Sequence, residues 1–141
     1  MNEAGISIVL AGLPKAEQVF CGHDELKGRF NQTVKLAPFS IVSHWSDFAD
    51  FTKGLLEVLG DIGQQVKTTK VFKALYIATE GRPRKICQLL TEALEERERE
   101  SDVLSNAHFE RAYDSLFSDE NPFAQSEAKL DAMINQGVKL S

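Results

Sequence analysis

The sequence predicts an α/β chain that is mostly helical, with two short parallel strands followed by a bundle of helices. Three observations predict this class. A β-branched and aliphatic run at residues 5–12 is typical of a strand buried on both faces. Alternating residues at 32–36 indicate a second strand. From residue 43 onward, apolar residues recur every three or four positions, which is the helical period.

The first expected elements are a strand, a short helix and a second strand. The run at residues 5–12 ends in glycine, residues 15–21 can form a short helix, and Pro38 ends the segment 32–36. This order is a fragment of a parallel α/β unit. Since two strands do not make a stable sheet by themselves, we expect that sheet partners are missing from the chain.

Four amphipathic helices are expected after the strands. The first carries an apolar stripe from Trp45 to Ile62, and its candidate ends are marked by short polar residues and glycines: Ser43 or Ser46 at the start, and Gly60 or Gly63 at the end. The second spans roughly residues 68–79.

The third expected helix starts at Pro83 and ends in the alternating charge run 95–100, which is most simply a solvated helix end. The fourth is capped by Ser105-Asn106. After it, a polar breaker segment precedes a weakly amphipathic stretch, so residues 118–141 are expected to be a mobile or weakly helical tail.

Composition narrows the possible functions. The chain has 141 residues, enough for one domain with a core, and 43% hydrophobic with 26% charged residues is ordinary for a soluble protein. Its 16 Lys+Arg and 21 Asp+Glu give a net charge of −5. This balance argues against a free-standing nonspecific DNA binder, because that activity depends on neutralising many phosphates.

The cysteines and the N-terminal residues indicate the cellular compartment of the protein. Cys21 and Cys87 lie far apart without metal-ligand spacing, and the histidines complete no zinc site, so we expect two reduced thiols and no bound metal. The apolar run at residues 6–12 is too short to span a bilayer, and the first residues lack the basic start and cleavage site of a signal peptide. We therefore expect a cytoplasmic protein with no membrane partner.

The aromatic residues have two interpretations. They could be platforms for stacking bases, but their helical spacing favours core packing; they are Trp45, Phe48, Phe51, Phe72, Tyr76, Phe109 and Tyr113. His44 and His108 are expected at a helix start and on a helix surface, with no triad or metal partner in the sequence.

The strongest candidate site is the segment from Thr79 to Ile86. Gly81 can close one helix in a left-handed conformation, Pro83 suits the first turn of the next, and Arg84 follows at once. A guanidinium near a helix N-terminus is well placed to meet a phosphate. The alternative is an ordinary interhelical turn with solvated basic residues.

A second candidate is Arg29, which lies just before the second expected strand. At the rim of a sheet it could stabilise charge on the γ-phosphate of a neighbouring subunit's nucleotide. The alternative is a surface arginine paired with Asp24 or Glu25, since such pairs are common.

The sequence lacks two motifs that ATP hydrolysis by P-loop proteins requires. No Gly-rich P-loop and no hydrophobic strand ending in paired acids occurs in the chain. We therefore expect that it is not an enzyme on its own and does not bind Mg²⁺ alone.

Taken in order, these features resemble the C-terminal half of an AAA+ ATPase. More narrowly, residues 4–117 resemble the TniB/TnsC branch, the ATP-dependent regulators of DNA transposition; the segments that carry the resemblance are 5–12, Arg29-Phe30, 78–81 and 109–113. The resemblance implies the last two parallel strands of a P-loop NTPase core at residues 1–42, an α-helical lid at 43–117, and the tail at 118–141.

The resemblance also implies roles for the candidate residues. Arg29 would be the arginine finger acting in trans on the adjacent protomer. Arg84, or alternatively Arg82, would be the sensor-2 residue that contacts ATP, within a sensor-2 region that includes Gly81 and Pro83. The first expected strand would carry sensor 1.

The implied assembly is a homo-oligomer on DNA that binds ATP between protomers and recruits a transposase and a target-selection protein. ATP would bind only with the missing N-terminal half or a neighbouring protomer. The alternatives are a stand-alone helical protein-interaction adaptor with no nucleotide role, and a compact helical DNA binder using Arg82, Arg84 and Lys85, which the acidic balance disfavours.

Overall fold

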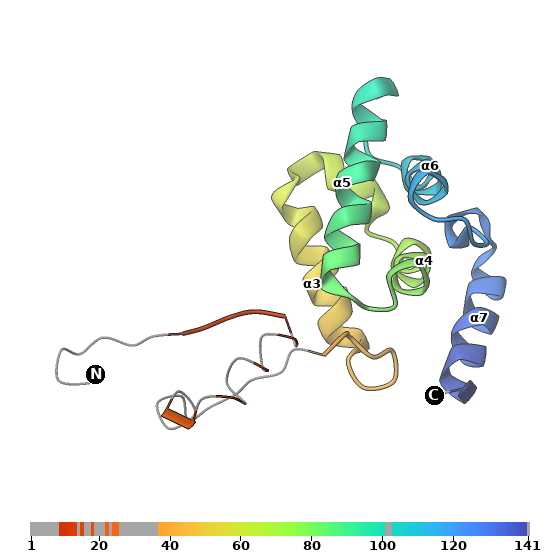
Figure 1. Ribbon diagram of the computed structural model, residues 1–141. Coiled ribbons are helices and arrows are strands. Elements are labelled where there is room, and N and C mark those ends of the chain that lie inside the picture. The colour runs from red at the N-terminus through yellow and green to blue at the C-terminus, as the bar shows by residue number, and fades with distance from the viewer. Residues whose placement is uncertain are drawn as a thin grey trace. The chain divides into compact units, whose positions relative to one another are not determined.

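The computed structural model describes residues 9–13, 15, 18, 22, 24–25, 37–100 and 103–140. Two compact units can be distinguished, residues 1–36 and residues 37–141. The second unit contains a series of helices (Figure 1): α3 (Trp45–Val58), η3 (Gly60–Val66), α4 (Thr69–Thr79), α5 (Pro83–Glu100), α6 (Asn106–Leu116), η4 (Pro122–Ala124) and α7 (Glu127–Leu140).

The predicted α/β class is wrong for the part of the chain that the structure describes. Residues 9–12, the end of the first expected strand, are not in a strand, and no other described residue is either. Val9 and Leu10 are 88% and 58% exposed. No strand lies among the described residues to accept the backbone hydrogen bonds of this run, and a strand-like sequence pattern alone does not make a sheet.

Several expectations fall outside the described residues. These are the second strand at 32–36, most of the short helix at 15–21, and Arg29.

The first long helix has a different N-cap from the prediction, but it ends just before Gly60, one of the two predicted glycines. The N-cap of α3 is His44, without a side-chain cap, so neither Ser43 nor Ser46 is the cap. The helix ends at Val58, and Gly60 follows with a φ of 60°, which favours glycine. The apolar stripe that predicted a single helix is therefore divided between α3 and the 3₁₀ helix η3.

The next three helices lie close to their predicted positions. The Thr68 hydroxyl caps α4 by accepting from the amide of Val71 at 3.3 Å. Pro83 is the first residue of α5, and Ser105 is the N-cap of α6. One difference is that α5 continues through the whole charge run to Glu100.

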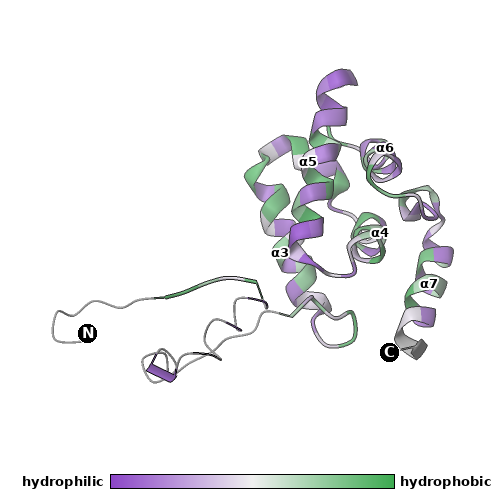
Figure 2. Ribbon diagram, viewed as in Figure 1, coloured by the Kyte–Doolittle hydropathy of each residue, from purple (hydrophilic) through white to green (hydrophobic). Residues whose placement is uncertain are grey.

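The core lies where these helices meet. In Figure 1, α4 lies between α5 and α7, and α6 runs beside α5. Figure 2 shows apolar residues on the inner sides of these helices and hydrophilic ones along the second half of α5. The expected core role of the aromatic stripe is confirmed, because its members are either buried or packed against buried residues: Phe48, Phe109 and Tyr113 in the first group, Trp45, Phe51, Phe72 and Tyr76 in the second.

The segment from residue 118 contributes to this core. The side chain of Asn121 accepts from the amide of Phe123 at 3.0 Å, and Asn106 donates to the Phe123 carbonyl at 2.9 Å. Phe123 and, on α7, Leu130 are buried. The polar breaker segment thus begins η4, and α7 packs against α4 instead of forming a free tail. No helix in the described part of the chain is both long and apolar enough to cross a membrane.

Candidate functional site

The turn between α4 and α5 is fixed by backbone contacts. Glu80, the C-cap of α4, has a φ of 54°, and Gly81 has a φ of 68°. The Gly81 carbonyl accepts from the amide of Phe39 at 2.8 Å. A Cβ at residue 81 would lie 2.1 Å from the Phe39 carbonyl oxygen, so only glycine fits. The predicted left-handed role of Gly81 is confirmed, although this conformation starts one residue earlier.

At the start of α5, two backbone amides have no acceptor among the described residues. The amide of Arg82 bonds the Thr79 carbonyl at 3.1 Å, and the amide of Ile86 bonds the Arg82 carbonyl at 3.0 Å. Between them, Pro83 has no N–H, and the amides of Arg84 and Lys85 have no intrahelical acceptor. No acidic residue lies in the first turn of α5. The positive end of the helix dipole is therefore not compensated from within the helix.

The basic side chains of this turn differ in their partners. Arg82 Nη2 lies 3.4 Å from Glu80 Oε2, and Lys85 Nζ lies 3.9 Å from Glu80 Oε1 and 5.9 Å from the centre of the Phe117 ring. Arg84 is exposed and makes no hydrogen bond or ion pair with the described residues. Of the two sensor-2 candidates, Arg84 is thus the one whose guanidinium is available to an anion.

Arg29, the other predicted site residue, lies outside the described residues. The structure brings together Gly81, Arg82, Pro83 and Arg84 at one turn.

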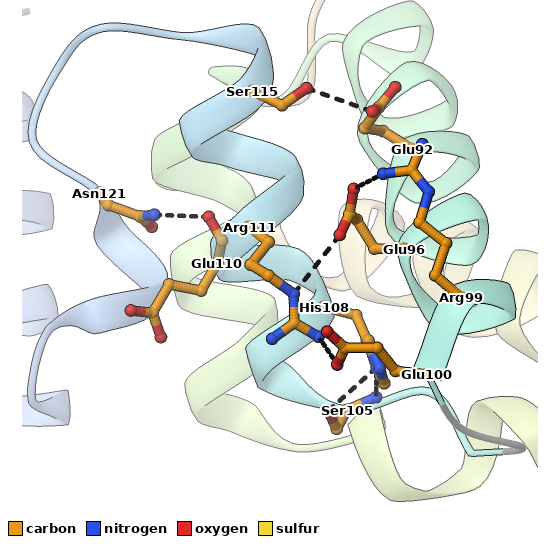
Figure 3. A network of polar contacts seen from close by, with 10 residues as sticks. All are labelled: Glu92, Glu96, Arg99, Glu100, Ser105, His108, Glu110, Arg111, Ser115 and Asn121. Atoms are coloured by element: carbon orange, nitrogen blue, oxygen red, sulfur yellow. Dashed lines mark hydrogen bonds and ion pairs between the residues drawn. The ribbon is translucent and has the colours of Figure 1, made fainter.

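A second polar cluster joins α5 to α6 (Figure 3). Glu96 lies 2.6 Å from Arg99 Nη1 and 3.4 Å from Arg111 Nε, and Arg111 Nη2 lies 2.6 Å from Glu100. The Ser115 hydroxyl donates to Glu92 at 3.2 Å. The Glu96 side chain is only 13% exposed. The charge run, expected to be a solvated helix end, is in part an interhelical network.

Sequence reasoning missed this network, although a signal was present. Glu92, Glu96 and Glu100 are four residues apart, so they lie on one face of a helix. That face meets α6, where Arg111 supplies the opposite charge.

His108 is not the helix-surface residue that the sequence predicted. It is 3% exposed, and its Nδ1 accepts from the amide of Ser105 at 3.0 Å. Burial, and then the charge of Arg111, lower the pKa of this imidazole from its usual value. The available signal was Ser105-x-x-His108, which has the spacing of a capping box with histidine in place of Glu or Gln.

The helices also enclose a small cavity of about 10 Å³. It is lined by side chains of α3, α4, α5 and α6, all apolar except Thr52. The Thr52 hydroxyl has no hydrogen-bond partner among the described residues. Because a buried water needs at least two polar partners, this cavity is a packing defect and not a ligand site.

A scan of protein-family models, a search of curated proteins and a search of solved structures each returned no match for this chain.

Proposed function

We propose that the helical body of residues 43–117 acts as the lid of a TniB-like ATP-binding regulator of DNA transposition. In this role, Arg84 contacts a phosphate of ATP that is held mainly by protein outside this chain. The observation that carries the proposal is the exposed guanidinium of Arg84 in the first turn of α5, which has no partner among the described residues.

Three features support a phosphate as the ligand at this turn. The amides of Arg84 and Lys85 have no intrahelical acceptor, the first turn of α5 carries no acidic residue, and Gly81 anchors the turn to Phe39. A fixed backbone reduces the entropy that a bound phosphate must overcome. Arg82 is a weaker candidate because Glu80 already pairs with it.

The chain supplies neither a P-loop nor an acidic magnesium-binding strand, so it would not hydrolyse ATP unaided. The working protein is proposed to be a homo-oligomer in which ATP lies between protomers, with Arg29 acting in trans. The ATP-bound assembly on DNA would recruit a transposase and a target-selection protein.

The test is a titration of the chain with ATP, followed by amide NMR and by phosphate release. We expect weak binding, on the order of millimolar, because a single arginine and two amides provide few contacts. The shifts should centre on Gly81, Arg84 and Lys85 and should be lost in Arg84→Ala. Arg99→Ala is the matched control, because it removes an exposed arginine from the other end of the same helix.

Two results would overturn the lid proposal. One is micromolar binding with measurable turnover, which would mean that the chain has a complete nucleotide site. The other is a set of shifts that Arg84→Ala leaves unchanged.

A stand-alone helical adaptor is the second candidate, and one observation favours it. Residues 37–140 bury their own apolar stripes, as a self-sufficient module would. A titration with ATP distinguishes the two functions. Amide shifts at Gly81, Arg84 and Lys85 that are lost in Arg84→Ala support the lid, whereas no shift at these residues supports the adaptor.

A further inference from the structure

The first turn of α6 is closed by a histidine where other capping boxes use Glu or Gln. The Ser105 amide donates to Nδ1 of His108 at 3.0 Å, and the Ser105 hydroxyl lies 3.0 Å from the same nitrogen. An amide can donate to Nδ1 only while that nitrogen carries a lone pair. The imidazole is therefore neutral, with its proton on Nε2.

The surroundings of His108 also oppose a positive charge. It is buried where α6 begins beside the end of α5. The charged groups that act on it among the described residues are Arg111 from α6, and Arg97, Glu96 and Glu100 from α5. The two glutamates favour an imidazolium, but both already pair with Arg111. An imidazolium would also face the positive end of the α6 dipole.

We propose that this capping box is an acid-sensitive latch on the junction between α5 and α6. When His108 takes up a proton, Nδ1–H replaces the lone pair and the Ser105 amide loses its acceptor. The imidazolium then lies beside Arg111 and the amides of the first turn. The start of α6 opens, while the remainder of the helical core stays folded.

The direction of the pH dependence follows from proton linkage. Burial and Arg111 lower the pKa of His108 in the closed latch, so the open state binds the proton more tightly. The latch is therefore fully closed above the ordinary histidine pKa of about 6.5 and weakens as the pH falls below it. Between the two pKa values, the opening equilibrium should increase by up to about tenfold per pH unit.

The test is hydrogen exchange of the full chain between about pH 7.5 and pH 5, read as protection factors corrected for intrinsic exchange. In the wild type, protection at Phe109 and Glu110 should fall with pH. His108→Gln supplies a non-titrating side chain suited to the same capping position, so its protection should stay constant. An equal fall in His108→Gln, or no fall in the wild type, would overturn the latch.

Two further measurements keep the result interpretable. His44→Gln removes an exposed histidine at the start of α3 and should leave the pH response of α6 unchanged. In the wild type, the Ser105 amide shift and the His108 Nδ1 shift should titrate together, with a midpoint below about 6.5. This measurement needs no variant to fold, and separate midpoints would contradict the proposal.

Discussion

At the scale of single residues, Gly81 determines the geometry of the α4–α5 turn. Its close approach to the Phe39 carbonyl excludes a side chain, and its positive φ favours glycine. The same glycine places Arg84 at the start of a helix that is anchored to another part of the chain. The availability of Arg84 for a phosphate thus depends on a residue that would not itself touch the ligand.

Gly81→Ala should destabilise the fold by at least about 2 kcal/mol, because a Cβ adds left-handed strain and a steric clash with backbone. Gly54→Ala is the matched control: Gly54 lies inside α3 with nothing within 4 Å of its Cβ position. That control should raise stability by about 0.5–1 kcal/mol through helix propensity. Urea unfolding measures both, and equal effects of the two substitutions would refute the role assigned to Gly81.

Thr52→Val should stabilise the protein by about 1 kcal/mol, because it removes a buried hydroxyl without a partner at nearly constant volume. Thr79→Val provides the contrast, since the Thr79 hydroxyl donates to the Leu75 carbonyl at 2.7 Å. That variant should lose stability. If Thr52→Val is also destabilising by thermal unfolding, the Thr52 hydroxyl must have a partner, such as a buried water.

At the scale of elements, α7 is attached to α4 by an apolar contact and by ion pairs. Leu130 is completely buried, while Lys73 Nζ lies 3.1 Å from Glu127 and 2.6 Å from Asp131. The hydrogen bonds to Asp131 and then Glu127 raise the pKa of Lys73, so it stays charged at neutral pH. Both carboxylates are about half exposed, so solvent weakens these pairs, and apolar burial should dominate.

Leu130→Ala should therefore cost about 2–5 kcal/mol, the range for a buried leucine that leaves a cavity. Gln136→Ala, at an exposed position of the same helix, should change stability by less than about 0.5 kcal/mol. Guanidinium unfolding measures both. A small effect of Leu130→Ala would show that α7 is not part of the cooperative core in solution.

At the scale of the whole molecule, the unit from residue 37 onward contains the core that the structure describes. A chain of residues 37–141 should therefore fold by itself. Its melting temperature should match that of the full chain to within about 4 °C, the smallest shift that 1 kcal/mol causes in a domain of this size. Circular dichroism melting measures this. A chain of residues 37–117 is the control and should melt without cooperativity, because it lacks Phe123 and Leu130.

Local sequence signals are enough to predict the helices between Thr68 and Leu116. Their ends depend on local chemistry: the Thr68 hydroxyl cap, the left-handed Gly81, Pro83 at a first turn and the Ser105 cap. The core role of the aromatic stripe could also be predicted, because helical spacing places its members on one face.

Other features depend on residues that are distant in the chain, and they could not be predicted from local sequence. Residues 9–12 have a strand-like pattern, but no other described residue forms a strand that could complete their hydrogen bonds. Glu96 is paired because Arg111 faces it from another helix. His108 is buried where α6 packs against α5, and Leu130 is buried where α7 packs against α4. These outcomes are set by contacts between segments far apart in the chain, which local propensity and periodicity do not encode.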